Sequence, residues 1–295
     1  MFPEDVKKGD ALIVFSRRRV HEVAGELQDY GIRCSLIYGA LPYDVRHEQA
    51  ALFSSGRNKV LVATDAIGMG MNLPIRRVVF LEDDKFDGKS RRFLHSSEFK
   101  QIAGRAGRRG LYEKGYAASA ARPGRLRRAL IEEDETIDRA VIGFPRTLIG
   151  IDAPLSAIIR QWMDAEGNEG YEKEVAEREL QLAREMEAEG IDDKEFIYRF
   201  ITIPFDEKNE GMRGVFAEMY RAEWRGSHLS IPKHFWGELP GGLRDLEVLY
   251  QLSDLLYIYG MRFGVEEPIE DILSLKKELS EKMIEILSAK QRAGK

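Results

Sequence analysis

The stretch that decides the fold is residues 62–72, Val-Ala-Thr-Asp-Ala-Ile-Gly-Met-Gly-Met-Asn. It continues an apolar run that begins at Lys59 and predicts a buried strand, and a glycine-bearing turn follows directly. Thr64 and Asp65 therefore lie at a strand end, before a turn with accessible backbone N–H groups. Groups of this kind hold phosphates, ribose hydroxyls or both. A Gly-x-Gly after a strand is also the ordinary sequence of a tight turn, so this stretch alone does not decide the function.

On both sides of this stretch, apolar strands alternate with amphipathic helices. Further strands are expected at residues 11–15, 35–38, 78–81 and 115–119. Helices are expected at residues 20–30, 42–56 and 96–104. Continuously apolar strands separated by helices predict a parallel sheet with helices on both faces.

From about Arg125 the pattern changes. Residues 126–150 are transitional, and beyond Pro154 nearly every segment predicts a helix. Residues 172–189 are expected to form a charged helix with a thin apolar stripe, and residues 243–259 an almost wholly apolar one. A last helix is expected after Pro268. The second half of the chain is therefore expected to be helical and to close with a helical hairpin.

Charge divides the chain in the same place. Residues 1–150 carry 26 Lys and Arg against 20 Asp and Glu, a net charge of +6. Residues 151–295 carry 19 against 30, a net charge of −11. The positive half is rich in arginine, which suits planar, bidentate contacts with phosphate. One half is thus expected to handle an anion, and the other to be a scaffold or docking surface.

The composition excludes several classes of site. The single cysteine, Cys34, rules out an internal disulfide and any cysteine-based zinc site, and we expect it to be buried. The five histidines show no ligand spacing, so we expect no metal site in this chain. No apolar run approaches the ~20 residues that cross a bilayer, and the N-terminus has no apolar signal core. We therefore expect a cytoplasmic protein with no membrane partner.

A second motif occupies residues 101–110, Gln-Ile-Ala-Gly-Arg-Ala-Gly-Arg-Arg-Gly. Arg105 and Arg108 are three residues apart, so in a helical turn their side chains point the same way. Gly104 and Gly107 leave room for another surface to approach closely. Two guanidinium groups presented together suit the oxygens of a transferring γ-phosphoryl group. A solvated basic turn is the plainer alternative for the motif taken alone.

Together these motifs resemble a known family. Residues 62–72 and 101–108 are similar to motifs V and VI of superfamily 2 helicases, and residues 12–17 to their motif IV. Residues 38–42, with Arg46 and Phe53, resemble the following segment, in which a helix is set over the RNA. The closer similarity is to RNA helicases of the mitochondrial-degradosome type and their bacterial relatives. It rests on residues 66–73, 101–108, 237–240 and 245–247.

The resemblance implies a fold and a domain organisation. It implies an α/β fold with a RecA-like parallel sheet and flanking helices, followed by an all-α accessory region. Residues 1–125 would be the second RecA-like motor domain, 126–240 a transitional and helical region, and 241–295 a small C-terminal helical domain. The chain would be the C-terminal half of an ATP-dependent RNA helicase involved in RNA degradation.

The resemblance also implies residue roles at the nucleotide. Arg105 and Arg108 would be arginine fingers that contact the γ-phosphate of ATP. Asp65 would contact the ribose or the other motor domain, Gly68 would let the backbone pass close to ATP, and Gln101 would connect the ATP and RNA sites.

At the RNA, the resemblance implies that Ser16, Arg17 and Thr64 bind the backbone of a single strand. The cofactor would be ATP with Mg²⁺, the metal held mainly by the first RecA-like domain. The 295 residues contain no Gly-x-x-x-x-Gly-Lys-Ser/Thr phosphate loop. We therefore expect that domain to precede Met1 in the natural protein, and this chain alone to hydrolyse no ATP.

Several alternatives stay open. A non-catalytic RNA-binding or scaffold protein with a motor-like fold would also lack a phosphate loop, although it has no chemical use for two finger arginines. A DNA helicase fragment would carry almost the same motifs V and VI. The acidic half is either a solvated surface or a docking site for a partner such as an exoribonuclease. The three tryptophans either pack in the core or stack on bases: Trp162, Trp224 and Trp236.

Overall fold

The computed structural model describes residues 3–68, 71–88, 90–107, 111–133, 136, 139–167, 170–229, 238–265 and 269–292. The chain divides into two compact units. The first contains residues 1–134, 241–247 and 278–295, and the second contains residues 135–240 and 248–277. The boundaries at 125/126 and 240/241 expected from the sequence stay predictions.

The first unit is built on a five-stranded sheet with the strand order β2-β3-β1-β4-β7. Its strands are β1 (Asp10–Ile13), β2 (Cys34–Ile37), β3 (Val60–Ala63), β4 (Arg77–Phe80) and β7 (Tyr116–Ser119). Every neighbouring pair is parallel, with Ala11 opposite both Leu61 and Val78. All five expected strands form within one or two residues of their expected bounds. The expected parallel α/β sheet is confirmed.

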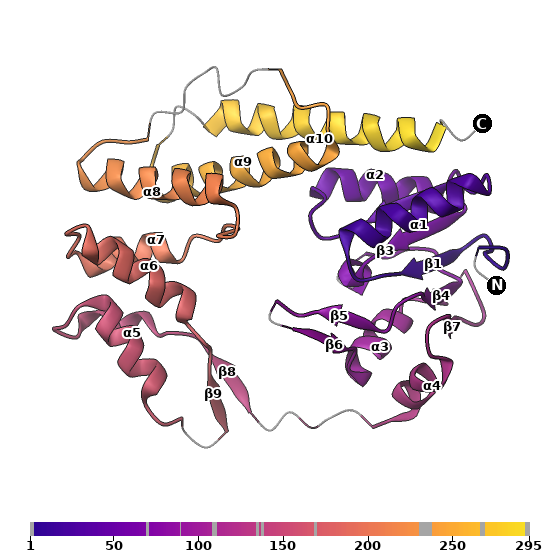
Figure 1. Ribbon diagram of the computed structural model, residues 1–295, viewed down its shortest axis with the longest axis horizontal. Helices are drawn as coiled ribbons and strands as arrows, with labels where there is room; N and C mark the ends of the chain where they lie inside the picture. The colour runs from indigo at the N-terminus through magenta and orange to yellow at the C-terminus, as the bar shows by residue number, and fades with distance from the viewer. Residues whose placement is uncertain are drawn as a thin grey trace. The chain divides into compact units, whose positions relative to one another are not determined.

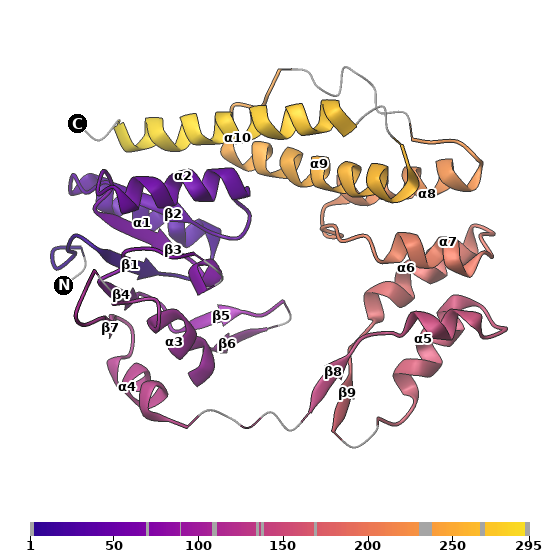
Figure 2. The ribbon, with the colours of Figure 1, turned by 180° about the vertical axis from the view of Figure 1, so that it is seen from behind.

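Helices cover both faces of this sheet. In Figures 1 and 2, α1 (Arg17–Asp29) and α2 (Tyr43–Ser54) lie on one side of it. The helices α3 (Ser96–Ala103) and α4 (Pro123–Ile131) lie on the other. The faces of β1 and β3 are wholly buried, as the continuous apolar runs in the sequence require. Below the sheet, Phe80 and Phe99 pack edge to face with ring centroids 5.0 Å apart.

A hairpin interrupts the alternation between β4 and α3. It consists of β5 (Asp84–Phe86) and β6 (Arg91–Phe93), which pair antiparallel. The sequence pattern did not predict it, because three-residue charged strands show no alternation to detect. The hairpin places Lys85 and Arg92 within contact of the first residues of α3, which matters for the site below.

The second unit is mostly helical. Its helices are α5 (Leu155–Asp164), α6 (Glu177–Ala188), α7 (Lys194–Ile201) and α8 (Glu210–Trp224), after a 3₁₀ turn η2 (Arg146–Gly150). Aromatic rings fill its core, where Phe200 stacks on Phe263 at 4.4 Å between centroids. The expected helix at 172–189 is wrong at its start. Residues 171–173 form the strand β9 (Tyr171–Lys173), which pairs with β8 (Ala140–Ile142), so the helix begins only at Glu177.

Two long helices end the chain, α9 (Leu243–Phe263) and α10 (Ile269–Arg292), as the apolar pattern predicts. Each is shared between the two units. Residues 243–247 of α9 and 278–292 of α10 belong to the first unit. In both views the carboxyl-terminal half of α10 lies beside α2, and its Leu279, Met283 and Leu287 are buried.

The structure also shows how far the single cysteine and two of the three tryptophans are buried. Cys34 is buried as expected, and burial raises the pKa of its thiol to about 12, which keeps it unreactive. Trp162 is buried and lies edge to face on Phe144, so it packs in the core. Trp224 is 40% exposed and contacts Phe196. Trp236 lies outside the described residues.

Candidate functional site

The carboxyl ends of the parallel strands bring the candidate residues to one edge of the sheet. Ser16 follows β1 and Thr64 follows β3, which is its neighbour in the sheet. The Ser16 hydroxyl accepts a hydrogen bond from the Arg19 N–H at 3.1 Å and so caps α1. The Thr64 hydroxyl accepts from the Ala66 N–H at 3.3 Å. Both hydroxyls keep their own hydrogen, which can still be donated to an anion.

Asp65 opens the 3₁₀ turn η1 (Asp65–Gly68) and is held by the hairpin. The Lys85 ammonium lies 2.9 Å from the Asp65 carboxylate and 2.8 Å from that of Glu98. Arg92 donates to both oxygens of Glu98, at 2.9 and 3.0 Å. Lys85 thus joins the turn after β3 to the first turn of α3.

These bonds set the protonation state of Glu98. Burial by itself raises the pKa of its carboxyl, but the hydrogen bonds from Arg92 and Lys85 outweigh burial and lower the pKa to about 2. Burial likewise opposes the charge of Lys85, and its bonds to Glu98 and Asp65 outweigh it, so the pKa of Lys85 is raised. At neutral pH Glu98 and Lys85 are therefore both charged. Sequence reasoning missed Lys85 and Glu98 as parts of the site because it did not predict the hairpin.

The two glycine-containing motifs touch each other at this edge. The Arg105 guanidinium donates a hydrogen bond to the Gly68 carbonyl. Gln101 lies beside the same glycine, because a Cβ on Gly68 would be 3.6 Å from its side chain. The structure therefore brings together Gly68, Gln101 and Arg105, which the sequence assigned to one nucleotide site. Arg108, the second expected finger, lies outside the described residues.

A close approach of two backbone segments fixes the turn after Arg105. Gly107 has a φ of +78°, and its N–H donates to the Ile75 carbonyl at 2.9 Å. A Cβ on Gly107 would lie 2.5 Å from the Gly115 nitrogen, and a Cβ on Gly115 would lie 2.5 Å from the Ala106 carbonyl carbon. Only glycine fits at either position. The turn that presents Arg105 is thus packed backbone against backbone.

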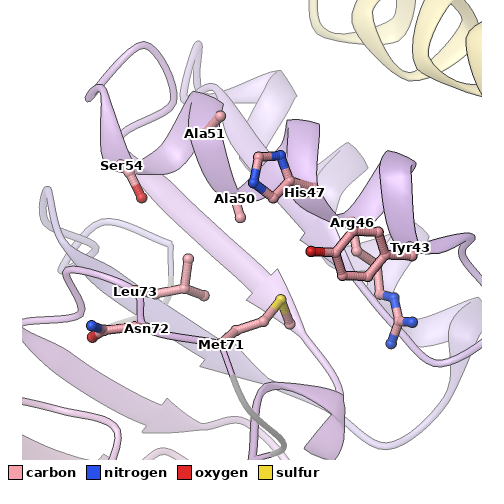
Figure 3. A pocket seen from close by; sticks show the side chains of 9 residues that line it. All are labelled: Tyr43, Arg46, His47, Ala50, Ala51, Ser54, Met71, Asn72 and Leu73. Atoms are coloured by element: carbon pink, nitrogen blue, oxygen red, sulfur yellow. The ribbon is translucent and has the colours of Figure 1, made fainter.

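A pocket of about 470 Å³ opens beside the strand end, between α2 and residues 71–73. Figure 3 shows its two walls, with the side chains of α2 facing the extended segment. The α2 wall carries Tyr43, Arg46, His47, Ala50, Ala51 and Ser54, and the other wall Met71, Asn72 and Leu73. Tyr43 is 69% exposed, and its ring lies 6.1 Å from that of His47. Of the α2 wall the sequence resemblance singled out only Arg46, whereas the opposite wall lies within residues 66–73, on which the resemblance rests.

Among the described residues, this edge can offer the guanidinium of Arg105 to a phosphate. In the described conformation Arg105 is bonded to a neutral carbonyl, whereas an ion pair with phosphate would add an attraction between two full charges. A phosphate placed there would therefore draw Arg105 away from Gly68. Among the residues that the structure describes, no group of three or more His, Cys, Asp or Glu side chains is placed to hold a metal ion.

The geometry agrees with a match to a known domain family. Residues 2–110 match the helicase conserved C-terminal domain. That segment contains the whole edge from Ser16 to Gly107, together with the hairpin between them. The resemblance to the C-terminal portion of superfamily 2 RNA helicases is confirmed, and the parallel sheet is the RecA-like sheet of that domain. The assignment to the mitochondrial-degradosome type stays a prediction.

Known proteins are similar to the same segment. The mitochondrial DExH-box ATP-dependent RNA helicase DExH18 of Arabidopsis thaliana is 50% identical over 110 residues. The mitochondrial ATP-dependent RNA helicase SUV3 of Saccharomyces cerevisiae is 43% identical over 104 residues. These matches cover 36% and 35% of this chain, and 14% of the length of each relative. The chain therefore matches only a small part of either protein.

Solved structures with similar arrangements include two DEAD-box proteins. The E. coli protein SrmB is 27% identical with a TM-score of 0.32, over 40% of this chain and 63% of its own. The C-terminal domain of Dbp5 is 19% identical with a TM-score of 0.34, over 62% of this chain and 83% of its own.

Within the described residues, no helix is both long and apolar enough to cross a membrane. The cytoplasmic location stays a prediction, and the two relatives are named as mitochondrial.

Proposed function

We propose that this chain supplies one wall of the ATP site and part of the RNA-binding edge of an ATP-dependent RNA helicase. The observation that supports it most is the contact between Arg105 and the Gly68 carbonyl. Arg105, the expected finger, thus lies against the turn expected to contact the nucleotide, at the carboxyl edge of the sheet. The first RecA-like domain would supply the phosphate loop and the residues that hold Mg²⁺.

In this proposal the edge has two ends. Asp65, Gly68, Gln101 and Arg105 face ATP, with Arg108 as a second finger. Ser16, Arg17 and Thr64 bind the phosphates of single-stranded RNA, contacts that fix the register of a strand without reading its sequence. When the two motor domains close on ATP, Arg105 exchanges the Gly68 carbonyl for the γ-phosphate and stabilises its developing charge. Docking of an exoribonuclease on the acidic half is not part of the proposal, because no contact or surface of the described residues supports it.

The test is RNA-stimulated ATP hydrolysis by the natural full-length protein and its Arg105→Ala variant. A loss on the order of a thousandfold in kcat is expected, which is the usual effect of removing an arginine finger. The matched control is Arg91→Ala, which removes an exposed arginine of the hairpin that pairs only with Asp84 among the described residues. If Arg105→Ala and Arg91→Ala both hydrolyse ATP at the normal rate, Arg105 is not a finger. The non-catalytic scaffold then becomes the better reading.

A further inference from the structure

Glu247 is a buried carboxylate that the proposed function does not use. It lies in the first turns of α9, in the part of that helix that belongs to the first unit, and is 4% exposed. Its two oxygens have different partners. One lies 2.9 Å from Arg17 Nε, and the other accepts a hydrogen bond from the Tyr38 hydroxyl at 2.7 Å. A residue more than 200 positions later in the chain is thus joined to the start of α1.

The contacts of Glu247 lie at the carboxyl ends of two strands of the sheet. Arg17 follows β1 and Tyr38 follows β2, and β3 lies between those two strands. Glu247 therefore bridges the strand ends on either side of the one that carries Thr64. It contacts the edge at which Ser16, Arg17 and Thr64 are expected to meet RNA.

The backbone under Arg17 is already fixed without Glu247. The Phe15 N–H donates to the Glu82 carboxylate at 2.9 Å, and Ser16 caps the helix that Arg17 begins. The freedom that remains belongs to the long side chain of Arg17, whose rotamers carry roughly 2 kcal/mol of entropy. The ion pair with Glu247 removes much of that freedom. Tyr38 in turn holds Glu247, and the His21 ring lies edge to face on the Tyr38 ring.

The pair leaves Arg17 able to bind a second anion. Its Nε is buried and lies 2.9 Å from Glu247, an ion pair whose geometry does not make a hydrogen bond, while about a third of the whole side chain (32%) stays exposed. A second anion can reach the guanidinium through that exposed part. A guanidinium has five N–H donors in a fixed fork, so one carboxylate on Nε orients the other donors without saturating them.

We propose that Glu247 is a positioning residue for RNA binding, which holds the Arg17 guanidinium in the orientation that accepts an RNA phosphate. Glu247 on α9 then belongs to the RNA-binding edge of the motor rather than to an independent accessory domain. This inference rests on the proposed function, because it requires that Arg17 contact RNA. It adds a residue that the motifs of the first 110 residues do not contain.

The test is a double-mutant cycle on the affinity of the chain for a labelled single-stranded RNA, measured by fluorescence anisotropy at one fixed salt concentration. Glu247→Gln keeps the size of the side chain and an oxygen for Tyr38, but removes the charge that orients Arg17. We expect it to weaken RNA binding roughly five- to tenfold, as contacting charged pairs usually couple. In an Arg17→Ala background the same change should have no further effect. Asp245→Asn, an exposed carboxylate two residues earlier on α9, should leave the affinity unchanged.

The outcomes separate the inference from the proposed function. If Arg17→Ala weakens binding and Glu247→Gln does not, Arg17 binds RNA without help and the positioning role is wrong. If Glu247→Gln tightens binding, the carboxylate competes with the phosphate and the inference is also wrong. If Arg17→Ala itself has no effect, the RNA role of Arg17 fails, and the inference fails with it. An equal loss from Glu247→Gln with and without Arg17 would mean a general structural effect.

Tyr38→Phe gives a second measurement that does not remove a charge. It keeps the ring that packs on His21 but deletes the hydroxyl, which donates to Glu247 and also lies 3.2 Å from His21 Nε2. We expect a loss of RNA affinity in the same direction and of about twofold, since one hydrogen bond that holds Glu247 is removed. The urea midpoints of both variants, compared with that of the unchanged chain, show whether the fold is intact. A loss of affinity that persists in the Arg17→Ala background would contradict the role of Tyr38 in holding Arg17 through Glu247.

Discussion

The two arginines of the candidate site are held in different ways. Arg17 lies against the buried carboxylate of Glu247, whereas Arg105 donates to the neutral carbonyl of Gly68. A charged partner keeps its arginine in place when a phosphate arrives, because the fork can bind both anions. A neutral carbonyl is displaced more easily by a phosphate, because the ion pair with phosphate adds an attraction between full charges that the carbonyl lacks. In the proposed function, the RNA end of the edge is thus oriented in advance, and the nucleotide end can change partners with the state of ATP.

The largest expected effect tests this difference by kinetics. Arg105→Ala should lower the kcat of RNA-stimulated ATP hydrolysis about a thousandfold and leave the RNA concentration at half-maximal rate nearly unchanged. Arg17→Ala should do the reverse, raising that RNA concentration roughly tenfold or more through a lost charge-assisted bond, with the kcat at saturating RNA preserved. Titrating RNA against the ATPase rate of each variant of the full-length protein measures both. If both variants lower kcat alike, the two ends do not have separate roles.

The next effect compares the two glycines of the nucleotide end. Gly107→Ala should lower the free energy of unfolding by about 3 kcal/mol, because φ is positive there and a Cβ would meet the Gly115 backbone. Gly68→Ala should cost less than about 1 kcal/mol, because its Cβ would make only an ordinary contact with Gln101. Urea unfolding of both variants measures the two costs. Equal costs would mean that Gly68 is also required by the fold, and a purely nucleotide-related role for it would be lost.

Sequence patterns predicted the sheet and half of the site for a physical reason. Parallel strands buried on both faces must be apolar without interruption, so the strands from β1 to β7 are visible as apolar runs. Their carboxyl ends share one edge, which places Ser16 and Thr64 together; that Gly68 and Arg105 belong to one site was expected only from the family resemblance.

The remaining part of the site depends on contacts that no local pattern records. Lys85 lies on a three-residue strand that exists only because it pairs with β6. Glu247 joins Arg17 across 230 positions of sequence, and its neighbours on α9 show only an apolar stripe. The helix expected at residues 172–189 was wrong at its start for the same reason, because residues 171–173 show no strand pattern of their own and form a strand only beside β8. In each case the partner, not the local pattern, decides the structure.

A smaller effect concerns the network that holds Asp65 at the nucleotide end. Glu98→Gln should cost about 2 kcal/mol of unfolding free energy at pH 7, because Arg92 and Lys85 lose a charged acceptor. The pKa of Glu98 is about 2 in the folded protein, below its usual 4.5, so the unfolded chain takes up the proton first as the pH falls. The stabilisation is therefore complete above about pH 4.5 and is lost as the pH falls toward 2.

Urea unfolding of the wild-type chain and Glu98→Gln at pH 7, 4 and 3 checks this sign. The difference between their unfolding free energies should shrink at each step. Taking the difference between the two proteins cancels the contributions of the other carboxylates, which both proteins share. A difference in unfolding free energy that stays constant down to pH 3 would show that Glu98 is not held by these charges.

The smallest effect separates two roles of Ser16 at the RNA end. Its hydroxyl caps α1, so Ser16→Ala should cost about 1 kcal/mol of stability whether or not Ser16 meets RNA. Ser16→Asp keeps an acceptor for the Arg19 N–H and adds a negative charge that suits a helix N-terminus, so its stability should match that of the unchanged chain. The same charge repels a phosphate, so RNA binding should weaken severalfold if the strand passes Ser16. A Ser16→Asp chain that is stable and still binds RNA normally would leave Ser16 as a helix cap alone, and would place the RNA contact at Arg17 and Thr64.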